Sequence, residues 1–292
     1  KQARRTETSS PLGQLFDHGF DCICNLALCA NCSGWAMIGG TLWYFGCQCS
    51  AQFSFFMAQW EEYYTGVLPH ATGKWCGVTE VNYGLGVITI LQAFIDRESF
   101  WTSTLSSRLP PALSSSLPPF ISTLEMRNIG VLSWFFMNLV LVSLSLRRVM
   151  THPNVTQHKL QFTAFTNLIT PFLLAMSPFI LPANIIQHYT RYVSVALGLA
   201  FSLVTKKIIV FSMAKMNYAS IQMDVLPLIM ACVWVTLDER LTQRGAKNVF
   251  GILCLWNAWR LLRWANLAID QICARLGIYC FTIKKKDGVK KD

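Results

Sequence analysis

The sequence holds no charged residue from Cys22 to Trp60. Because a helix needs about 20 apolar residues to cross the hydrocarbon layer of a bilayer, this stretch is long enough for two crossings. We place the turn between them near the residues NCSGW. The whole chain is similarly apolar, with 53% hydrophobic and only 14% charged residues and a mean hydropathy of +0.37. The sequence therefore predicts an all-α, polytopic integral membrane protein.

Charge-poor runs of spanning length recur along the chain and predict about eight transmembrane helices within a single membrane domain, 1–292. The expected helices are 12–31, 35–64, 79–96, 126–146, 160–182, 190–213, 221–237 and 247–268. The longest polar interruption is DRESFWTSTLSSRLPPALSSSLPPF. Its Pro-Pro pairs predict a loop without helix.

Positive charge falls on alternate connections between the expected helices. The basic segments are KQARR, SLRRVMTHPNVTQHK, TKK with Lys215, and the tail 276–292, which ends in IKKKDGVKKD. Since Lys and Arg are enriched on the cytosolic side of membrane proteins, we expect these segments, including a basic cytosolic tail, to lie there. This placement accounts for the net charge of +10, and we expect no nucleic-acid partner.

The first residues of the chain combine a helix start with two acids. SSPLG predicts a turn that opens a helix, and Gly13, Asp17 and Asp21 then follow at intervals of four, on one face. Carboxylates one turn apart can converge on a hard cation such as Mg²⁺. Alternatively, they are polar residues in the first helical turns, where the helix dipole favours an acid. A charge deep in a span costs about 2.5–3.5 kcal/mol, which favours a function for Asp21.

The spacing of the wider stretch resembles a family signature. Ala3, Arg4, Gly13, Asp17 and Asp21 read A-R-x8-G-x3-D-x3-D, which is similar to the second part of D-x-x-D-G-x-x-A-R-x8-G-x3-D-x3-D of the CDP-alcohol phosphatidyltransferases. KQARRT, SSPLG, LFDHG, QWEEYYTGVL, CGVTEV and QICARLGIYCFTIK resemble the eukaryotic choline and ethanolamine phosphotransferase branch. The first two signature aspartates would precede Lys1. We therefore expect an N-terminally truncated chain with a partial catalytic motif in 1–21 and eight of the family's ten helices.

The resemblance implies a reaction and its partners. Phosphocholine or phosphoethanolamine would pass from CDP-choline or CDP-ethanolamine to the hydroxyl of diacylglycerol, forming phosphatidylcholine or phosphatidylethanolamine and CMP. The cofactor would be Mg²⁺ or Mn²⁺. The resemblance further implies a homodimer in the membrane lipid of the endoplasmic reticulum or Golgi, with its active site facing the cytosol.

The resemblance also implies roles for individual residues. Asp17 and Asp21 would bind the metal, while Ala3, Arg4 and Gly13 would shape the nucleotide and phosphate pocket. Asp21 and His18 are two candidates for the catalytic base that takes the hydroxyl proton. His18 lies three residues before Asp21 and an imidazole titrates near neutral pH, although a histidine that only hydrogen-bonds at the interface fits the sequence as well.

The segment QWEEYYTG offers candidate headgroup ligands. Trp60, with Tyr64 or its neighbour Tyr63, could hold the amino-alcohol cation on ring faces, and Glu61 or Glu62 could neutralise it. An aromatic belt at the membrane interface, with solvated acids, explains the same residues equally well. Both roles stay open at this point.

Three functional classes fit such a chain. They are the phosphotransferase, a catalytically incomplete relative of it, and a non-enzymatic membrane scaffold or transporter. The sequence shows no inverted repeat and few charges in its later helices, which argues against a transporter.

Overall fold

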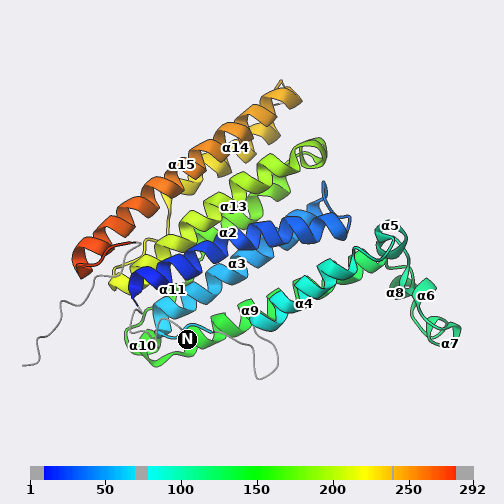
Figure 1. Ribbon diagram of the computed structural model, residues 1–292, viewed down its shortest axis with the longest axis horizontal. Helices are drawn as coiled ribbons and strands as arrows, with labels where there is room; N and C mark the ends of the chain where they lie inside the picture. Colours follow the sequence, from blue (N-terminus) through cyan, green and yellow to red (C-terminus); the bar gives the residue numbers. More distant parts are fainter. Residues whose placement is uncertain (1–9, 70–77, 239, 281–292) are drawn as a thin grey trace, which may run out of the picture.

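The computed structural model describes residues 10–69, 78–238 and 240–280, and within them the chain forms helices without any β-strand. Long helices lie side by side in a layered bundle (Figure 1). They are α2 (Pro11–Trp35), α3 (Leu42–Thr65), α4 (Val78–Leu91), α9 (Met126–Thr151), α13 (Ala183–Ala214), α14 (Leu226–Leu237) and α15 (Gln243–Leu276). The predicted all-α class is confirmed.

Three helical stretches of the described chain are long and apolar enough to cross a membrane. They are Met126–Thr151, Gln161–Ile180 and Ala183–Ala214, and Glu80–Leu91 and Met223–Leu237 are shorter apolar helices. Helix α13 is kinked at Tyr189, and at 1.5 Å per residue the part from Thr190 to Ala214 extends about 38 Å, more than a hydrocarbon layer requires. The protein is thus an integral membrane protein, while the full number of eight crossings stays a prediction.

The turn between the first two helices lies later than predicted. Helix α2 continues through NCSGW to Trp35, and α3 begins only at Leu42. The turn instead uses MIGG, where Met37 and Gly40 have φ angles of 57° and 76°. Glycine adopts positive φ without steric cost, so Gly40 breaks the helix more effectively than the residues NCSGW do.

The span predicted over 160–182 is present as the apolar stretch Gln161–Ile180, but it is not one continuous α-helix. The chain forms α11 (Gln161–Thr166), α12 (Ile169–Met176) and the 3-10 helix η1 (Ser177–Ile180) in succession. Proline has no amide hydrogen and is best tolerated in a first helical turn, which is where Pro171 and Pro178 lie.

The Ser/Pro-rich segment also differs from expectation, because it contains one-turn helices. They are α5 (Arg97–Trp101), α6 (Leu105–Arg108), α7 (Pro111–Ser114) and α8 (Pro119–Ser122). Pro111 and Pro119 occupy the first helical positions, where the fixed φ of proline favours a helix start. Two further short elements, α10 (Pro153–Gln157) and η2 (Met223–Val225), follow α9 and precede α14.

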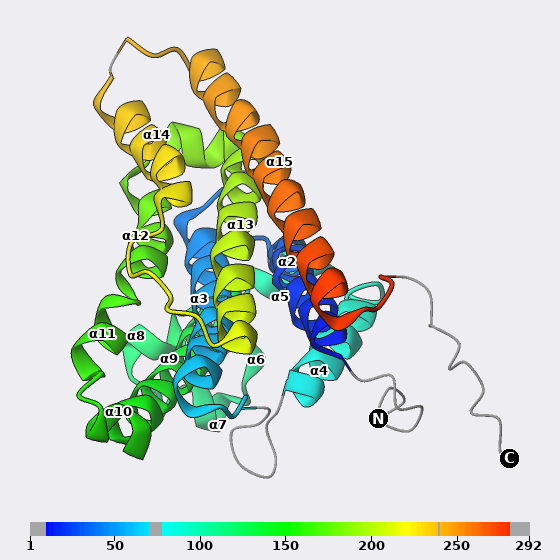
Figure 2. The same ribbon diagram turned by 90° about the vertical axis from the view of Figure 1, so that its left-hand side faces the viewer.

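The helix ends divide into two groups (Figures 1 and 2). The start of α2 lies at the same end of the bundle as the last turns of α13 and α15 and as α10, while α5–α8 lie at the opposite end. The first end carries Arg147 and Arg148 of α9, Lys215 after α13 and Arg275 of α15. The fold therefore gathers these basic residues, predicted to share one side, at the end where the acids of α2 begin.

Helix α13 is the centre of the bundle, in contact with α2, α3 and α15. Buried polar groups connect it to α3: Gln48 Nε2 donates to the Ser194 carbonyl at 2.9 Å, and Ser194 Oγ donates to Gln48 Oε1 at 2.8 Å. Tyr44 Oη lies 2.5 Å from the same Ser194 hydroxyl. Because an unpaired polar group is costly away from water, this network fixes the register of the two helices.

A small residue brings α2 close to α13. A Cβ atom at Gly198 would lie 2.6 Å from Cδ2 and 3.1 Å from Cγ of Leu26. Membrane helices lack a strong hydrophobic drive to associate, so close backbone approach at small residues is a main source of their packing energy. The Gly198–Leu26 contact sets how α2 is seated.

We expect Gly198→Val to lower the free energy of unfolding by about 1–3 kcal/mol, because the added methyl groups overpack the contact with Leu26. Thermal unfolding in detergent measures the change. Gly84→Val in α4 is the matched control, since no atom lies within 4 Å of its Cβ position. Adding Leu26→Ala to Gly198→Val should restore part of the loss. Equal effects of the two valines would contradict this role.

Candidate active site

The helix that carries the acids begins as the sequence predicted. Ser10 is the N-cap of α2, its hydroxyl accepts a hydrogen bond from the Gly13 amide at 3.2 Å, and Pro11 is the first helical residue. A serine N-cap satisfies an amide that the helix leaves unpaired, and proline at the next position loses no bond. The cap fixes where the helix begins, and the start of the helix determines the direction in which each later side chain of α2 points.

Gly13, Asp17 and Asp21 lie on the exposed face of α2, while Leu15 and Cys22 are buried. The predicted common face is confirmed. The Asp21 side chain is 52% exposed, and among the described residues no Lys or Arg forms an ion pair with either aspartate. The two carboxylates are exposed, and no Lys or Arg of the described chain neutralises them.

His18 borders this face. Its Nδ1 lies 3.7 Å from Oδ2 of Asp21, and its side chain is 17% exposed. The separation is too long for a direct hydrogen bond, yet a small rotation or one water would connect the two groups. Both candidates for the base therefore lie at the same place, and the geometry leaves both open.

The carboxylates fit a hydrated divalent ion. Mg²⁺ prefers oxygen ligands and commonly uses one or two carboxylates together with several waters, and Asp17 and Asp21 supply such oxygens on a face open to water. The described parts of the chain contain no group of three or more His, Cys, Asp or Glu arranged to hold a metal. The prediction of Mg²⁺ or Mn²⁺ stays a prediction, with these two residues as its ligands.

Of the three residues predicted to shape the phosphate pocket, the structure describes only Gly13. Ala3 and Arg4 lie outside the residues that the structure describes. Gly13 is exposed one turn before Asp17, and Ser10 Oγ, at 3.7 Å, is what its missing Cβ would meet. Among the residues that the structure describes, the notch in front of Asp17 is therefore unfilled.

The predicted headgroup ligands have protein partners of their own. Trp60 is fully buried and its Nε1 donates to the Ala164 carbonyl at 3.0 Å. The Tyr64 hydroxyl accepts a hydrogen bond from Asn167 Nδ2 at 2.7 Å. The structure does not bring either ring to the face of Asp17. Their role as headgroup ligands stays a prediction, and these contacts give them a structural role.

Glu61 is held in an ion pair. It is buried, and Arg148 of α9 donates to its two oxygens at 2.5 and 2.7 Å. Bidentate pairing of this kind is directional and strong. A headgroup cation would have to displace Arg148 to reach this carboxylate.

Its neighbour Glu62 is the acid of this segment that contacts α2. Gln14 Nε2 donates to Glu62 Oε1 at 2.9 Å. Successive helical residues differ by about 100° in direction, so adjacent glutamates meet different helices. The sequence alone does not show which of the two glutamates contacts α2, because it does not show which side of α3 faces α2.

Lys206 is a residue that sequence reasoning missed. It is 9% exposed and comes from α13, and its Cε lies 3.3 Å from the Cβ position of Gly19 in α2. The sequence pattern TKK by itself indicates only a positively charged flank of the helix. The absence of side chain at Gly19, one turn after Leu15, was the signal that something packs there.

Fold and site together define an integral membrane protein with an acidic, exposed face at one end of its helix bundle. No family model matches the chain. It is 31% identical to the uncharacterized CDP-alcohol phosphatidyltransferase class-I family protein 3 of Dictyostelium discoideum, over 98% of this chain and 75% of that protein. The chain therefore belongs to the CDP-alcohol phosphatidyltransferase class-I family, and the predicted resemblance is confirmed.

Two further relatives bear on the branch. The chain is 28% identical to choline/ethanolaminephosphotransferase 2 of Arabidopsis thaliana, over 98% of this chain and 74% of that protein. Over 95 residues it is 40% identical to human cholinephosphotransferase 1, which covers 32% of this chain and 23% of that protein.

We expect Glu61→Leu to lower the free energy of unfolding by about 1–3 kcal/mol, because the partly buried guanidinium of Arg148 loses its partner. Thermal unfolding of the purified protein measures the loss. The double variant Glu61→Leu/Arg148→Leu should recover much of it, and Glu98→Leu, an exposed acid in α5, is the control. A stable Glu61→Leu protein that has lost headgroup binding would instead support the ligand role.

Proposed function

We propose that the protein transfers phosphocholine or phosphoethanolamine from CDP-choline or CDP-ethanolamine to diacylglycerol. Membership of the family supports a transferase of this general kind, and the Arabidopsis relative carries both headgroups in its name. The observation that carries the proposal is the pair of exposed carboxylates, Asp17 and Asp21, which lie on one face of α2 without a Lys or Arg partner among the described residues.

In the proposed reaction the diacylglycerol oxygen attacks the phosphorus that bears the amino alcohol. A new P–O bond forms, the P–O bond to CMP breaks, and the hydroxyl proton passes to a protein base. A divalent ion held by Asp17 and Asp21 would neutralise charge on the phosphate oxygens. The open notch at Gly13 leaves room for the phosphates beside Asp17.

Asp21 and His18 are positioned to take the proton. Their nearest polar atoms are 3.7 Å apart, so a proton accepted by one can be stabilised by the other. A base must lie within hydrogen-bond reach of the hydroxyl, directly or through one water. The exposed face of α2 gives a lipid hydroxyl access to both side chains.

The same face suits a lipid acceptor. Phe20 lies between the acids in sequence, is 58% exposed, and stacks on Phe16 with ring centroids 6.1 Å apart. An apolar ring beside carboxylates provides contact for acyl or glycerol carbons while the hydroxyl meets the base. The soluble donor approaches from water at the helix start.

Location and assembly form part of the proposal. The basic residues at the end of the bundle that carries Asp17 favour a cytosolic active site, in the endoplasmic reticulum or Golgi membrane. A homodimer follows from the family resemblance. An assay with both donors determines whether the protein prefers the choline or the ethanolamine headgroup.

We expect Asp17→Asn and Asp21→Asn each to reduce transfer by about 100-fold or more, because the substitution removes a charge needed at the phosphates. The assay uses membranes with the full-length protein, Mg²⁺, diacylglycerol and labelled CDP-choline or CDP-ethanolamine, and chelation by EDTA should abolish the product reversibly. Asp270→Asn, an exposed acid of α15, is the control.

Retained activity in both asparagine variants would reject the assigned metal face. No labelled phospholipid from either donor, in a wild-type protein that folds normally and in an assay where a known relative works, would reject the transferase. A catalytically incomplete relative or a membrane scaffold would then be the better account.

We expect His18→Gln to lower kcat by about 100-fold if the imidazole is the base. Glutamine keeps a hydrogen-bonding side chain but cannot accept the hydroxyl proton. If Asp21 is the base, His18→Gln should instead keep kcat within about tenfold of the wild type. The kcat of the variant, measured at a fixed pH, separates the two.

A further inference from the structure

A second charged region lies between α13 and α15 at the same end of the bundle. Residues 192–205 of α13 and 248–259 of α15 contain no charge, and these stretches end at Lys206–Lys207 and at Arg260. Charged residues that directly follow apolar spans lie at the level of the lipid headgroups. This region is therefore at the membrane surface.

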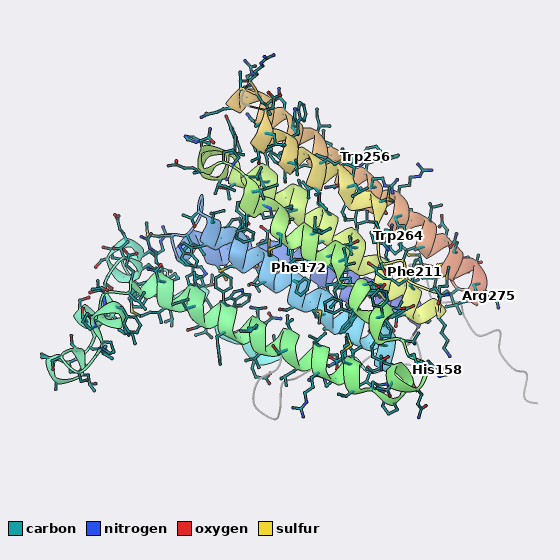
Figure 3. The ribbon with its side chains drawn as sticks, turned by 180° about the vertical axis from the view of Figure 1, so that it is seen from behind. His158, Phe172, Phe211, Trp256, Trp264 and Arg275 are labelled. Carbon is teal, nitrogen blue, oxygen red and sulfur yellow. The ribbon has the colours of Figure 1, made fainter. Side chains whose placement is uncertain are left out.

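The region borders an open cavity of about 260 Å³. Leu203 and Lys207 of α13 and Arg260, Arg263, Trp264 and Leu267 of α15 line it. Figure 3 shows Trp264 between Trp256 and Arg275 along α15. The lining thus combines cations with two leucines and a tryptophan, a mixture suited to a molecule with an anionic group and apolar chains.

The cavity carries excess positive charge. Asp224 of η2 pairs with both Lys207 and Arg260, and Lys207 Nζ also lies 3.2 Å from Gln222 Oε1. Arg263 stacks on Trp259, with its guanidinium carbon 5.3 Å from the ring centroid. Within the chain that the structure describes, no acid pairs with Arg263. Three cations against one carboxylate leave two positive charges.

We propose that this cavity binds the phosphate of an anionic phospholipid from the adjacent leaflet. Arginine recognises phosphate through several N–H groups at once, and basic pockets between membrane helices hold anionic headgroups. Leu203, Leu267 and the indole of Trp264 supply apolar contact for the glycerol and first acyl carbons. The ammonium of a zwitterionic lipid would meet the excess positive charge, so the cavity favours a net anionic lipid.

The cavity is separate from the acidic face of α2. Leu15, Ile209 and Ala268 form a buried cluster between the three helices, and Trp264 packs against it. Leu15 belongs to the side of α2 opposite the carboxylates. A lipid in the cavity therefore contacts Trp264, which packs against the cluster that holds α2, and it leaves Asp17 and Asp21 accessible.

The test uses the purified full chain in a neutral detergent. Dioctanoyl phosphatidylglycerol, dioctanoyl phosphatidylcholine and inorganic phosphate are titrated separately, and bound lipid is counted by native mass spectrometry and by the rise in unfolding temperature. Phosphatidylglycerol should bind saturably and more tightly than phosphatidylcholine. Arg263→Gln should weaken it by about fivefold, the effect of one cation at a membrane surface, while Arg263→Lys should retain most of the affinity.

The matched control is Arg275→Gln, an exposed arginine in the last turn of the same helix, which should bind as the wild type does. Equal affinity for the two lipids, or wild-type affinity in Arg263→Gln, would overturn the proposal. Full displacement of the lipid by an equal concentration of inorganic phosphate would also overturn it, because the site would then hold a free anion. Catalytic activity does not enter these readouts.

Discussion

The contact between α2 and α13 is the constraint on which the rest of the site depends. Leu26 of α2 packs on Gly198 of α13, and the Lys206 side chain packs on Gly19 of α2. One side of α2 is therefore buried against the bundle. A helix turns about 100° per residue, and burial of Leu15 and Cys22 therefore turns Asp17 and its partner Asp21 outward. The acids are exposed because the other side of the same helix is packed against the bundle.

Two other acids at this end of the bundle are paired with cations. Glu61 is paired with Arg148, and Asp224 with two cations, so these carboxylates join helices and are not free for ligands. The carboxylates of α2 differ in having no Lys or Arg partner among the residues described; the basic side chain nearest to them is His18, 3.7 Å from Asp21. Unpaired acids near lipid are costly unless water or a cation satisfies them. This contrast is the physical reason to assign the chemistry to Asp17 and Asp21.

The sequence predicted the features that depend on local periodicity. Helix phase placed Asp17 and Asp21 on one face, and the apolar runs indicated the long helices. It could not predict features set by partners distant in the chain. Nothing in QWEEYY shows that Glu61 faces Arg148 of α9, 87 residues later, while Glu62 faces Gln14. The turn at MIGG was misplaced because a polar NCS segment resembles a loop but continues the helix.

The central claim is that the exposed face of α2 binds a divalent cation, and Mn²⁺ electron paramagnetic resonance tests it most directly. In the full-length protein with CDP present, free Mn²⁺ should decrease as protein is added, with about one or two ions bound per chain, as carboxylate sites for phosphoryl transfer hold. The Asp17→Asn/Asp21→Asn protein, folded to the same unfolding temperature, should leave Mn²⁺ free. Equal Mn²⁺ binding by the wild type and the double variant would contradict the account.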